Sequence, residues 1–238
     1  MPNHQKHRGQ HSDDVHLFND KWMPILCQAV RDFSYLLTLG YPDQASLKLV
    51  GDRFRLNKRQ RKAVMRSGCA NQSVWERQKK ECSLSDLNGS TVVMDAYNVL
   101  ITTESLLSDG IILGCRDGCF RDLASLHGTY RKVEETIPAI QLIGQALAAF
   151  GVQQVSWYLD SPISNSGRLK GLILEEAQQQ GWNWEAKLVA NPDKDLAISP
   201  EIVISSDSWV IDQSRRWFNL MAYLISLKKG ILHIRQLK

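Results

Sequence analysis

The sequence lacks any apolar stretch long enough to cross a membrane. A membrane helix needs about 20 consecutive, mostly apolar residues, and no run in this chain of 238 residues approaches that length. The first 20 residues are polar and rich in histidine, and they contain no apolar core of the kind that secretory signals carry. We therefore expect a cytoplasmic protein without membrane contact.

Cysteine is scarce, and its spacing excludes the common cysteine-based sites. The chain has five cysteines, an odd number, and no two form a C-x-x-C pair. Cys115 and Cys119 lie four residues apart, but no second pair of cysteine or histidine stands at zinc-finger spacing. We expect reduced, mostly buried thiols rather than disulfides or structural zinc.

Three phosphate-handling motifs are also missing. There is no G-x-x-x-x-G-K-[ST] loop, and no G-x-G-x-x-G follows the first apolar run at residues 91–94. A D-x-D-x-T phosphatase motif is absent as well, because Asp95 is followed by Ala96, Tyr97 and Asn98. These absences argue against a nucleotide- or phosphate-handling enzyme on a similar sheet.

The chain does have enough apolar content for a core, and its pattern changes near residue 88. Hydrophobic residues make up 43% of the sequence. Residues 1–20 are expected to form a disordered tail. Between residues 21 and 88, apolar residues recur at helix spacing and no strand signal interrupts them, which predicts a small bundle of about four short helices.

After residue 88, short β-branched and apolar runs alternate with helical stretches. The runs lie at residues 91–94, 154–159, 185–190, 201–204 and 231–234, and the helical stretches lie near 136–150, 168–180 and 214–228. This alternation predicts an α/β domain over residues 89–238, with a parallel sheet, right-handed crossovers and flanking helices.

Aspartates follow three of these runs. Asp95 comes directly after the first run, Asp160 after the second, and Asp207 shortly after the fourth. The carboxyl ends of parallel strands meet at one edge of the sheet, where ligands bind in such folds. Converging carboxylates repel one another unless a cation joins them, and their hard oxygens suit Mg²⁺ or Mn²⁺. One aspartate alone would be interpreted as a helix cap.

These segments resemble those of the PIN-like and NYN-type nucleases. Residues 92–100 resemble the opening strand that ends in D-x-x-N, with Asp95 and Asn98 at those positions. Residues 158–162 resemble the second strand with its acid, and residues 202–208 resemble a late strand ending in S-x-D. The chain as a whole also resembles an uncharacterised prokaryotic family that joins a short basic helical module to a PIN-like domain. The resemblance implies metal-dependent cleavage of RNA.

The remaining acids of the resemblance are less defined. PIN nucleases usually carry an acid on a helix between the first two strands, and Asp117 and Asp122 are the candidates here. For the third strand Asp193 and Asp195 compete, and we prefer Asp195 because Pro192 would end the strand. Asp212 follows the S-x-D segment, as a second acid often does in this family. These residues complete the expected catalytic set.

Two further segments suggest contact with phosphate. Small residues before an expected helix could leave backbone N–H groups free for a substrate phosphate, or could simply cap the helix; they are Ser164, Ser166 and Gly167, with Arg168 beside them. Residues 53–66 contain seven basic residues and no acidic one. Such a stripe is typical of a nucleic-acid surface, although a solvated helix face is the usual alternative. The expected RNA-binding residues are Arg53, Arg55, Lys58, Arg59, Arg61, Lys62 and Arg66.

The leading hypothesis is therefore a ribonuclease in which Asp95, Asp160 and Asp207 hold one or two Mg²⁺ or Mn²⁺ ions. Asn98 would orient substrate or a ligand carboxylate. The alternative is a non-catalytic RNA-binding protein that keeps the PIN-like fold with an incomplete site. The sequence gives neither the RNA substrate nor the oligomeric state.

Overall fold

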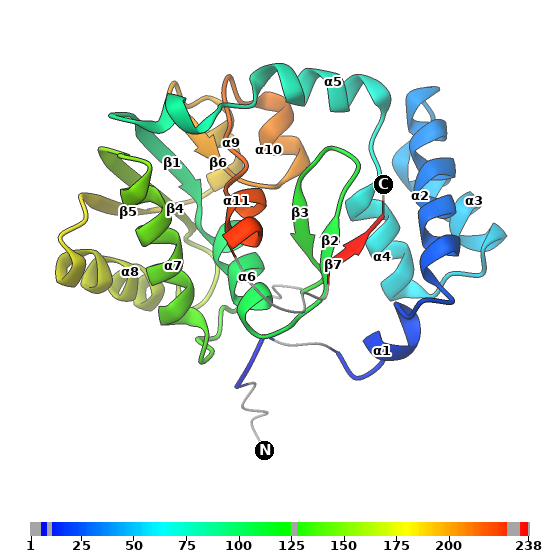
Figure 1. Ribbon diagram of the computed structural model, residues 1–238, viewed down its shortest axis with the longest axis horizontal. Helices are drawn as coiled ribbons and strands as arrows, with labels where there is room; N and C mark the ends of the chain where they lie inside the picture. Colours follow the sequence, from blue (N-terminus) through cyan, green and yellow to red (C-terminus); the bar gives the residue numbers. More distant parts are fainter. Residues whose placement is uncertain (1–5, 9–10, 125–127, 228–233, 238) are drawn as a thin grey trace. The chain divides into compact units, whose positions relative to one another are not determined.

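A computed structural model describes residues 6–8, 11–124, 128–227 and 234–237. The chain divides into two compact units, shown in Figure 1. The sheet unit comprises Met1–Arg8, Lys80–Ser108 and Ala124–Lys229. The helical unit comprises Gly9–Lys79, Asp109–Leu123 and Gly230–Lys238. None of the described helices is long and apolar enough to span a membrane.

Four parallel strands form the centre of the sheet unit. They are β1 (Thr91–Asp95), β4 (Gln154–Asp160), β5 (Trp184–Val189) and β6 (Ile202–Ile204), in the order β5-β4-β1-β6. In β1 and β6 all residues except Thr91 are buried, as expected for parallel strands covered on both faces. Met94 pairs with Trp157 of β4 and with Ile204 of β6, so β1 lies at the middle of the core. The predicted α/β fold with a parallel sheet is confirmed.

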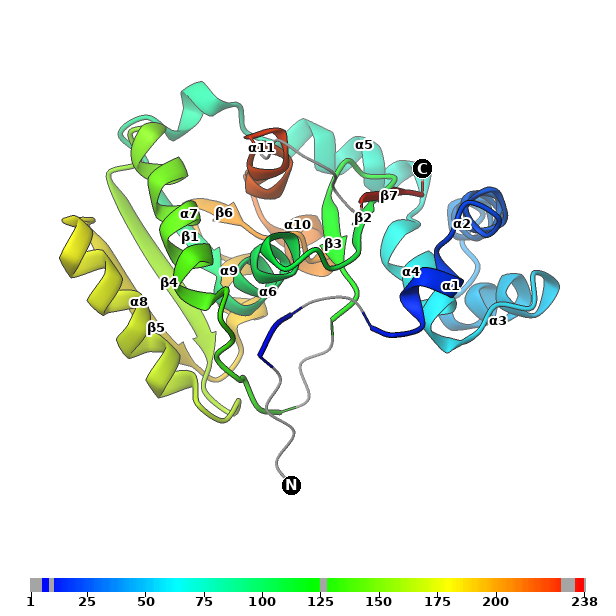
Figure 2. The ribbon, with the colours of Figure 1, turned by 60° about the horizontal axis from the view of Figure 1, so that its bottom comes forward.

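Helices cover this sheet and connect its strands (Figure 2). They are α6 (Ala96–Leu107), α7 (Thr136–Ala149), α8 (Ser166–Gln180), α9 (Pro192–Ala197), α10 (Ser208–Gln213) and α11 (Leu220–Leu227), after a short 3-10 helix η1 (Leu84–Leu87). Helix α7 contacts α6 and α8, and α8 packs against β4 and β5. Helix α9 contacts β1 and β4.

The strand order fixes where a ligand would bind. From β1 the chain passes through α6 and α7 to β4 on one side of β1, and α8 leads on to β5 in the same direction. The connection through α9 then returns the chain to β6, on the other side of β1. The direction of winding therefore reverses between β1 and β6. In open α/β sheets, the carboxyl end of the sheet at such a reversal is the usual ligand position.

One close approach between α7 and α8 depends on a glycine. A β-carbon at Gly144 of α7 would lie 2.1 Å from the ring of Trp182, which follows α8. Helix α8 ends at Gly181, whose φ of 71° is the left-handed conformation that glycine adopts without strain. These glycines let the chain turn sharply and place Trp182 against α7.

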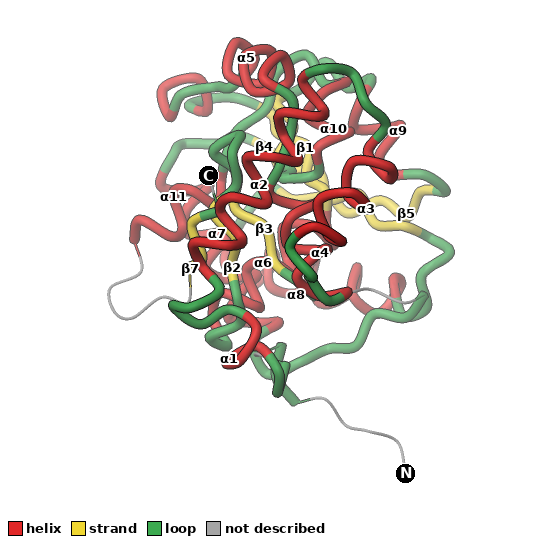
Figure 3. The backbone as a smooth tube through the Cα atoms, turned by 90° about the vertical axis from the view of Figure 1, so that its right-hand side faces the viewer, coloured by secondary structure: helices red, strands yellow, loops and turns green. Residues whose placement is uncertain are grey.

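The helical unit contains the expected short helices (Figure 3). They are α1 (Asp14–Leu17), α2 (Met23–Thr38), α3 (Asp43–Arg53), α4 (Lys58–Ser67) and α5 (Asn71–Lys80), the last reaching the start of the sheet unit. Asn57 and Gln60 form a reciprocal capping box at the start of α4. The helices enclose a core that includes Phe33, Val64 and Leu113. The predicted helical segment before residue 88 is confirmed: its described elements are helices.

The described part of residues 1–20 is not the solvated tail that its polar composition suggested. Arg8 is buried in the sheet unit, where its Nε donates to Glu104 Oε2 at 2.8 Å. In the helical unit Asp14 and Phe18 are buried. Charged residues can be buried when each finds a partner, and Asp14 accepts from Arg59. A polar composition therefore gave the wrong expectation for these residues.

The segment from 89 to 238 does not form one unit. A hairpin of β2 (Ile112–Gly114) and β3 (Phe120–Asp122) belongs to the helical unit, where β7 (Ile234–Gln236) pairs parallel with β2. The apolar residues Leu113, Leu123 and Leu237 lie in the same core as α2 and α4, which explains the assignment. Residues 231–233 of the expected fifth strand lie outside the described residues. The described strand β7 is not part of the four-stranded sheet.

Candidate functional site

Asp95 lies at the carboxyl end of the central strand and begins α6. Its Oδ1 accepts a hydrogen bond from the backbone N–H of Asn98 at 3.2 Å, and its Oδ2 accepts from Ser205 Oγ at 3.0 Å. The side chain is buried. Burial raises the pKa of Asp95 to about 7; the two hydrogen bonds oppose this shift, and Asp193 and Asp207 add to it. Burial therefore disfavours the ionised form of this carboxyl group.

The loop after β6 is tied to the turn after β1. Ser206 donates from its backbone N–H and from its hydroxyl to Asn98 Oδ1, at 2.8 and 2.9 Å. Ser205 Oγ accepts from the N–H of Asp207 at 3.0 Å and donates to Asp95. These bonds align the D-x-x-N segment with the S-x-D segment. The D-x-x-N and S-x-D segments, which the sequence suggested as parts of one site, are thus adjacent in space.

Asp207 caps α10, the short helix that follows this loop. Its Oδ1 accepts from the backbone N–H groups of Trp209 at 2.9 Å and Val210 at 3.1 Å. This is the helix-cap role that one aspartate after a strand would be expected to play. The negative charge nevertheless acts on its neighbours, because it raises the pKa values of Asp95 and Asp193.

Asp160 and Asp193 supply two further carboxylates. Asp160 ends β4, and its Oδ1 is buried without a hydrogen-bond partner among the described residues. Asp193 lies in the first turn of α9 and is exposed, and its pKa is raised by partial desolvation and by the charges of Asp207 and Asp160. We call Asp95, Asp160, Asp193 and Asp207 the acidic cluster. Its four members follow β1, β4, β5 and β6, at the carboxyl edge of the sheet.

The acidic cluster is not a compact metal-binding group. Across the part of the chain that the structure describes, no three acidic, histidine or cysteine side chains lie together closely enough to hold a metal ion as they stand. The charges of neighbouring members raise the pKa values of Asp95 and Asp193. Like charges in this situation repel and remain apart unless a cation neutralises them. The donor set consists of oxygens only, which is the chemistry that Mg²⁺ and Mn²⁺ prefer.

The preference for Asp195 as the third acid differs from the arrangement found. Asn191 caps α9 by accepting from the N–H of Lys194, and Pro192 is the first helical residue. Both aspartates therefore stand in the first turn of one helix. The charge of Asp193 acts on Asp95, and the charges of Asp207 and Asp160 act on Asp193. Asp193 is therefore a member of the acidic cluster, and the catalytic role expected of Asp195 stays a prediction.

Asp117 and Asp122 do not lie on a helix as the resemblance required. Both belong to the hairpin of the helical unit, Asp117 in its turn and Asp122 at the end of β3. Asp117 is buried and pairs with Arg121 at 2.6 Å and with Arg77 at 2.5 Å. Burial alone would raise the pKa of Asp117, but these guanidinium groups lower it to about 2. Asp122 pairs with Arg66 at 3.3 Å.

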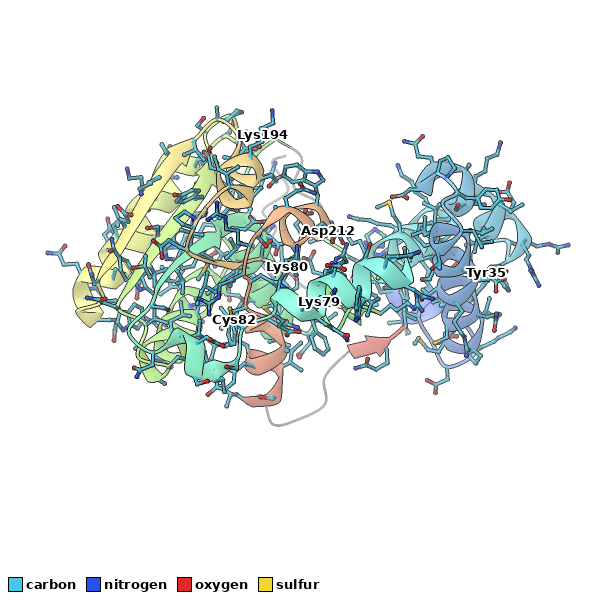
Figure 4. The ribbon with its side chains drawn as sticks, turned by 90° about the horizontal axis from the view of Figure 1, so that it is seen from above. Tyr35, Lys79, Lys80, Cys82, Lys194 and Asp212 are labelled. Atoms are coloured by element: carbon cyan, nitrogen blue, oxygen red, sulfur yellow. The ribbon has the colours of Figure 1, made fainter. Side chains whose placement is uncertain are left out.

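Asp212, the second acid after the S-x-D segment, lies in α10. Its backbone carbonyl accepts a hydrogen bond from Lys80 Nζ at 2.7 Å, and the carbonyl of Ile211 accepts from the same group at 2.9 Å. Both Lys80 and Asp212 are labelled in Figure 4. Lys80 thus places a positive charge at the carboxyl end of α10, where it stabilises the helix.

In the expected phosphate-binding segment, the hydroxyl of Ser166 already forms hydrogen bonds within the chain. The hydroxyl of Ser166 is buried and lies within hydrogen-bond distance of Tyr97 Oη, Asp160 O and Ile163 O. The backbone of Ser164 bonds to Gly128 and Tyr130. Gly167 and Arg168 are exposed in the first turn of α8. Ser166 is therefore occupied within the chain, and phosphate contact stays a prediction for the other residues.

Most of the basic segment is engaged in contacts within the helical unit. Arg59 pairs with the buried Asp14, and Arg61 pairs with Asp52 at 2.7 Å. The remaining contacts are Arg53 with Asp32, Arg66 with Asp122, and Lys62 Nζ with the carbonyl of Leu123. Burial and the charge of Arg66 lower the pKa of Lys62 to about 8. Among the described residues, Arg55 and Lys58 are exposed and form no ion pair.

Comparisons with known proteins place the chain in a family. Residues 84–223 match the family described as "Domain of unknown function (DUF5616)", and residues 25–80 match "Protein of unknown function (DUF434)". The chain belongs to the DUF5616 family. It is also 32% identical to "Uncharacterized protein MJ0935" of Methanocaldococcus jannaschii over 184 residues, covering 77% of this chain and 88% of that protein. No solved structure matches the chain.

The two family matches meet between residues 80 and 84. All four members of the acidic cluster fall inside the DUF5616 segment, and the whole basic segment falls inside the DUF434 segment. The candidate chemistry and the candidate binding surface therefore belong to different family modules. Neither family description assigns an activity to its module.

Sequence reasoning gave no role to two residues that contact the site. Ser205 was recognised only as the serine of the S-x-D segment, yet it hydrogen-bonds to Asp95. Tyr97 was recognised only as an intervening residue of D-x-x-N, yet it hydrogen-bonds to Ser166. The S-x-D motif itself could have indicated a role for Ser205, because the serine is one of its defining residues. The partner of Tyr97 lies 69 residues away, so no local pattern could have given it.

Proposed function

We propose that this protein is a ribonuclease that hydrolyses phosphodiester bonds with the help of Mg²⁺ or Mn²⁺. The observation that carries the proposal is the acidic cluster at the carboxyl edge of the sheet. Its members lie at or shortly after the ends of the four strands of the parallel sheet and include a buried oxygen of Asp160 without a described partner. Buried polar atoms usually have partners, so this oxygen supports the proposal that a cation binds here.

The electrostatics of the cluster also support a cation. Burial raises the pKa of Asp95, partial desolvation raises that of Asp193, and neighbouring carboxylates add to both shifts. A divalent ion among these groups would stabilise their ionised forms and remove the repulsion that keeps them apart. Asp95, Asp160 and Asp207 would hold the ion, and Asp193 would complete the set of oxygen donors. When bound, the ion would supply an activated water and neutralise charge on the scissile phosphate.

The residues around the cluster would position the carboxylates and the substrate. Ser205 orients Asp95 through its hydrogen bond to Oδ2. Asn98 uses its carbonyl oxygen to accept from Ser206, so its amide N–H groups would be the part that meets a substrate oxygen. Arg168, exposed in the first turn of α8, could bind a flanking phosphate.

RNA is proposed as the substrate on two grounds. The resemblance to PIN-like and NYN-type nucleases implies it, and the basic segment supplies exposed cationic side chains at Arg55 and Lys58. A cytoplasmic location is part of the same proposal. The five cysteines, all within the described residues, form no disulfide, as is usual in a reducing compartment.

The test is cleavage of a fluorescent single-stranded RNA with Mn²⁺, for the parent and for Asp95→Asn and Asp193→Asn. We expect the parent to cleave, EDTA to stop the reaction, and each of these variants to lose at least about 100-fold in rate, since metal ligands carry the chemistry. Asp195→Asn is the comparison on the same turn of α9, because it shows which of the two aspartates serves the site. Equal activity of the parent and Asp95→Asn would contradict the proposal.

A second candidate function is RNA binding without catalysis. One observation favours it, namely that no compact metal-binding group exists among the described residues. This candidate predicts that RNA binds but stays intact at every Mn²⁺ concentration, and that Asp95→Asn leaves binding unchanged. Measuring binding and cleavage on the same RNA separates the two functions.

A further inference from the structure

A chain of hydroxyl groups joins the segment after β1 to the segment after β4. Tyr97 stands in the first turn of α6, two residues after Asp95. Its Oη lies 2.7 Å from Ser166 Oγ, at the start of α8. Ser166 Oγ in turn lies 2.6 Å from the carbonyl oxygen of Asp160 and 2.5 Å from that of Ile163. Tyr97 and Ser166 are both buried.

The direction of each hydrogen bond follows from the number of protons. A serine hydroxyl has one proton, and a carbonyl oxygen can only accept. Ser166 must therefore give its proton to the carbonyls of Asp160 and Ile163, and Tyr97 must donate to Ser166. Burial raises the pKa of Tyr97, so its phenol keeps the proton that this arrangement needs.

The turn that Ser166 closes is held in a conformation that it would not adopt freely. Asn165 has a φ of 71°, which is uncommon for a residue other than glycine. Its side-chain amide donates to the carbonyl of Tyr130 at 2.9 Å, and the ring of Tyr130 packs against that of Tyr97 at 5.6 Å between centroids. The phenol of Tyr97 and the turn after Asp160 are thus fixed together by three contacts.

We propose that Tyr97 and Ser166 are positioning residues that set the distance between Asp160 and Asp95 for cation binding. The inference rests on the proposed metal-dependent function and deepens it. Without the hydroxyl chain, the turn after β4 loses its hydrogen-bonded connection to α6, and the position of Asp160 relative to Asp95 is less constrained. The side chain of Asp160 then spends less time beside the other carboxylates of the acidic cluster.

The test compares Tyr97→Phe with the parent. This change keeps the ring that packs on Tyr130 and removes only the donated proton. We expect hydrogen exchange of the backbone amides between residues 161 and 169 to quicken in the metal-free variant. We also expect the Mn²⁺ concentration for half-maximal binding and for half-maximal cleavage to rise by about tenfold, the usual size of an effect on residues that orient metal ligands. The maximal rate at saturating Mn²⁺ should change much less.

Two further variants make the result specific. Tyr223→Phe is the control, since Tyr223 packs against Phe150 in the same unit and lies outside the hydroxyl chain. It should match the parent in exchange of residues 161–169 and in Mn²⁺ dependence. The double variant Tyr97→Phe, Ser166→Ala should bind Mn²⁺ little more weakly than Ser166→Ala alone, because both changes break one chain of hydrogen bonds.

The outcomes separate the inference from the function on which it rests. If the parent binds Mn²⁺ and cleaves RNA while Tyr97→Phe shows an unchanged Mn²⁺ dependence, the positioning role is wrong and the proposed function stands. If the parent binds no Mn²⁺, the proposed function fails and the positioning role fails with it. Faster exchange in Tyr97→Phe would then identify the hydroxyl chain as a purely structural contact.

Discussion

At the scale of single residues, Asp95 combines two properties that are hard to reconcile without a ligand. It is buried at the end of the central strand, and within the described part of the chain it accepts two hydrogen bonds, from Asn98 and Ser205. Ionising it in that place costs free energy, and nearby Asp193 and Asp207 increase the cost. Selection for stability alone would favour an uncharged cap such as asparagine or serine at this position.

The raised pKa of Asp95 makes the stability of the metal-free protein depend on pH. The folded protein binds this proton more tightly than the unfolded chain, whose carboxyl titrates near the ordinary value of 3.8. The resulting stability is fully present below that value and is lost as the pH rises through about 7. We expect the parent to lose a few kcal/mol between pH 4 and 8, at roughly 1.4 kcal/mol per pKa unit.

Asp95→Asn is the variant that isolates this effect. Asparagine still caps α6, but it has no proton to release, so its unfolding free energy should fall less over the same pH range. Urea unfolding in EDTA at several pH values measures both proteins. Parallel pH profiles for the parent and the variant would show that Asp95 is ionised in the folded state without cost.

At the scale of elements, the sequence predicted the sheet well because its strands are strongly patterned. Strands β1, β4 and β6 are largely apolar runs with an aspartate at their end or within three residues after it, so the sequence predicted both the strands and the positions of Asp95, Asp160 and Asp207. Helix α4 was readable from the box of Asn57 and Gln60. These elements are specified by local residues.

Other elements depend on contacts that a local pattern does not contain. Strands β2 and β3 are three residues each, and their hairpin is turned by Gly118 with a φ of 82°. Its membership of the helical unit comes from packing of Leu113 and Leu123 on distant helices. Likewise, the choice between Asp193 and Asp195 depends on where α9 faces once it packs on β1 and β4. Sequence spacing alone leaves both choices open.

The contact between α7 and the turn after α8 gives a test of the packing. Gly144→Ala would place a methyl group against the ring of Trp182, where the added β-carbon is 2.1 Å away. Overpacking of this kind costs about 1–3 kcal/mol of unfolding free energy. Gly171→Ala on α8 is the matched control, because nothing lies within 4 Å of its added carbon.

Since alanine is favoured over glycine within helices, Gly171→Ala should raise stability by about 0.5–1 kcal/mol. Thermal unfolding of the two variants beside the parent measures both effects. A Gly144→Ala variant as stable as Gly171→Ala would mean that Trp182 does not lie against α7.

At the scale of the whole molecule, charge is divided between the two family modules. The acidic cluster lies in the sheet unit, and the basic segment lies in the helical unit, where five of its seven residues have partners within the unit. Replacing Arg59, Arg61 and Lys62 would therefore disturb the fold as well as any RNA contact. Arg55 and Lys58 are the better probes of the basic segment.

If this segment binds RNA, replacing Arg55 and Lys58 by glutamine should weaken binding most at low salt. The slope of log affinity against log salt should become shallower by about 0.7 for each phosphate contact that is lost on a single strand. Fluorescence anisotropy across a salt series measures the slope, and Lys48→Gln on α3 serves as an exposed basic control. An unchanged slope would remove the basic segment from the RNA-binding surface.

The central claim is that the acidic cluster binds a divalent cation, and anomalous diffraction from crystals soaked in Mn²⁺ tests it most directly. We expect an anomalous peak from a Mn²⁺ ion bound by carboxylate oxygens of Asp95, Asp160 and Asp207, with Asp160 Oδ1 among its ligands. The cluster should contract around that ion, because the repulsion between its carboxylates is removed. Manganese bound only elsewhere, with the four carboxylates still apart at saturating Mn²⁺, would contradict the account.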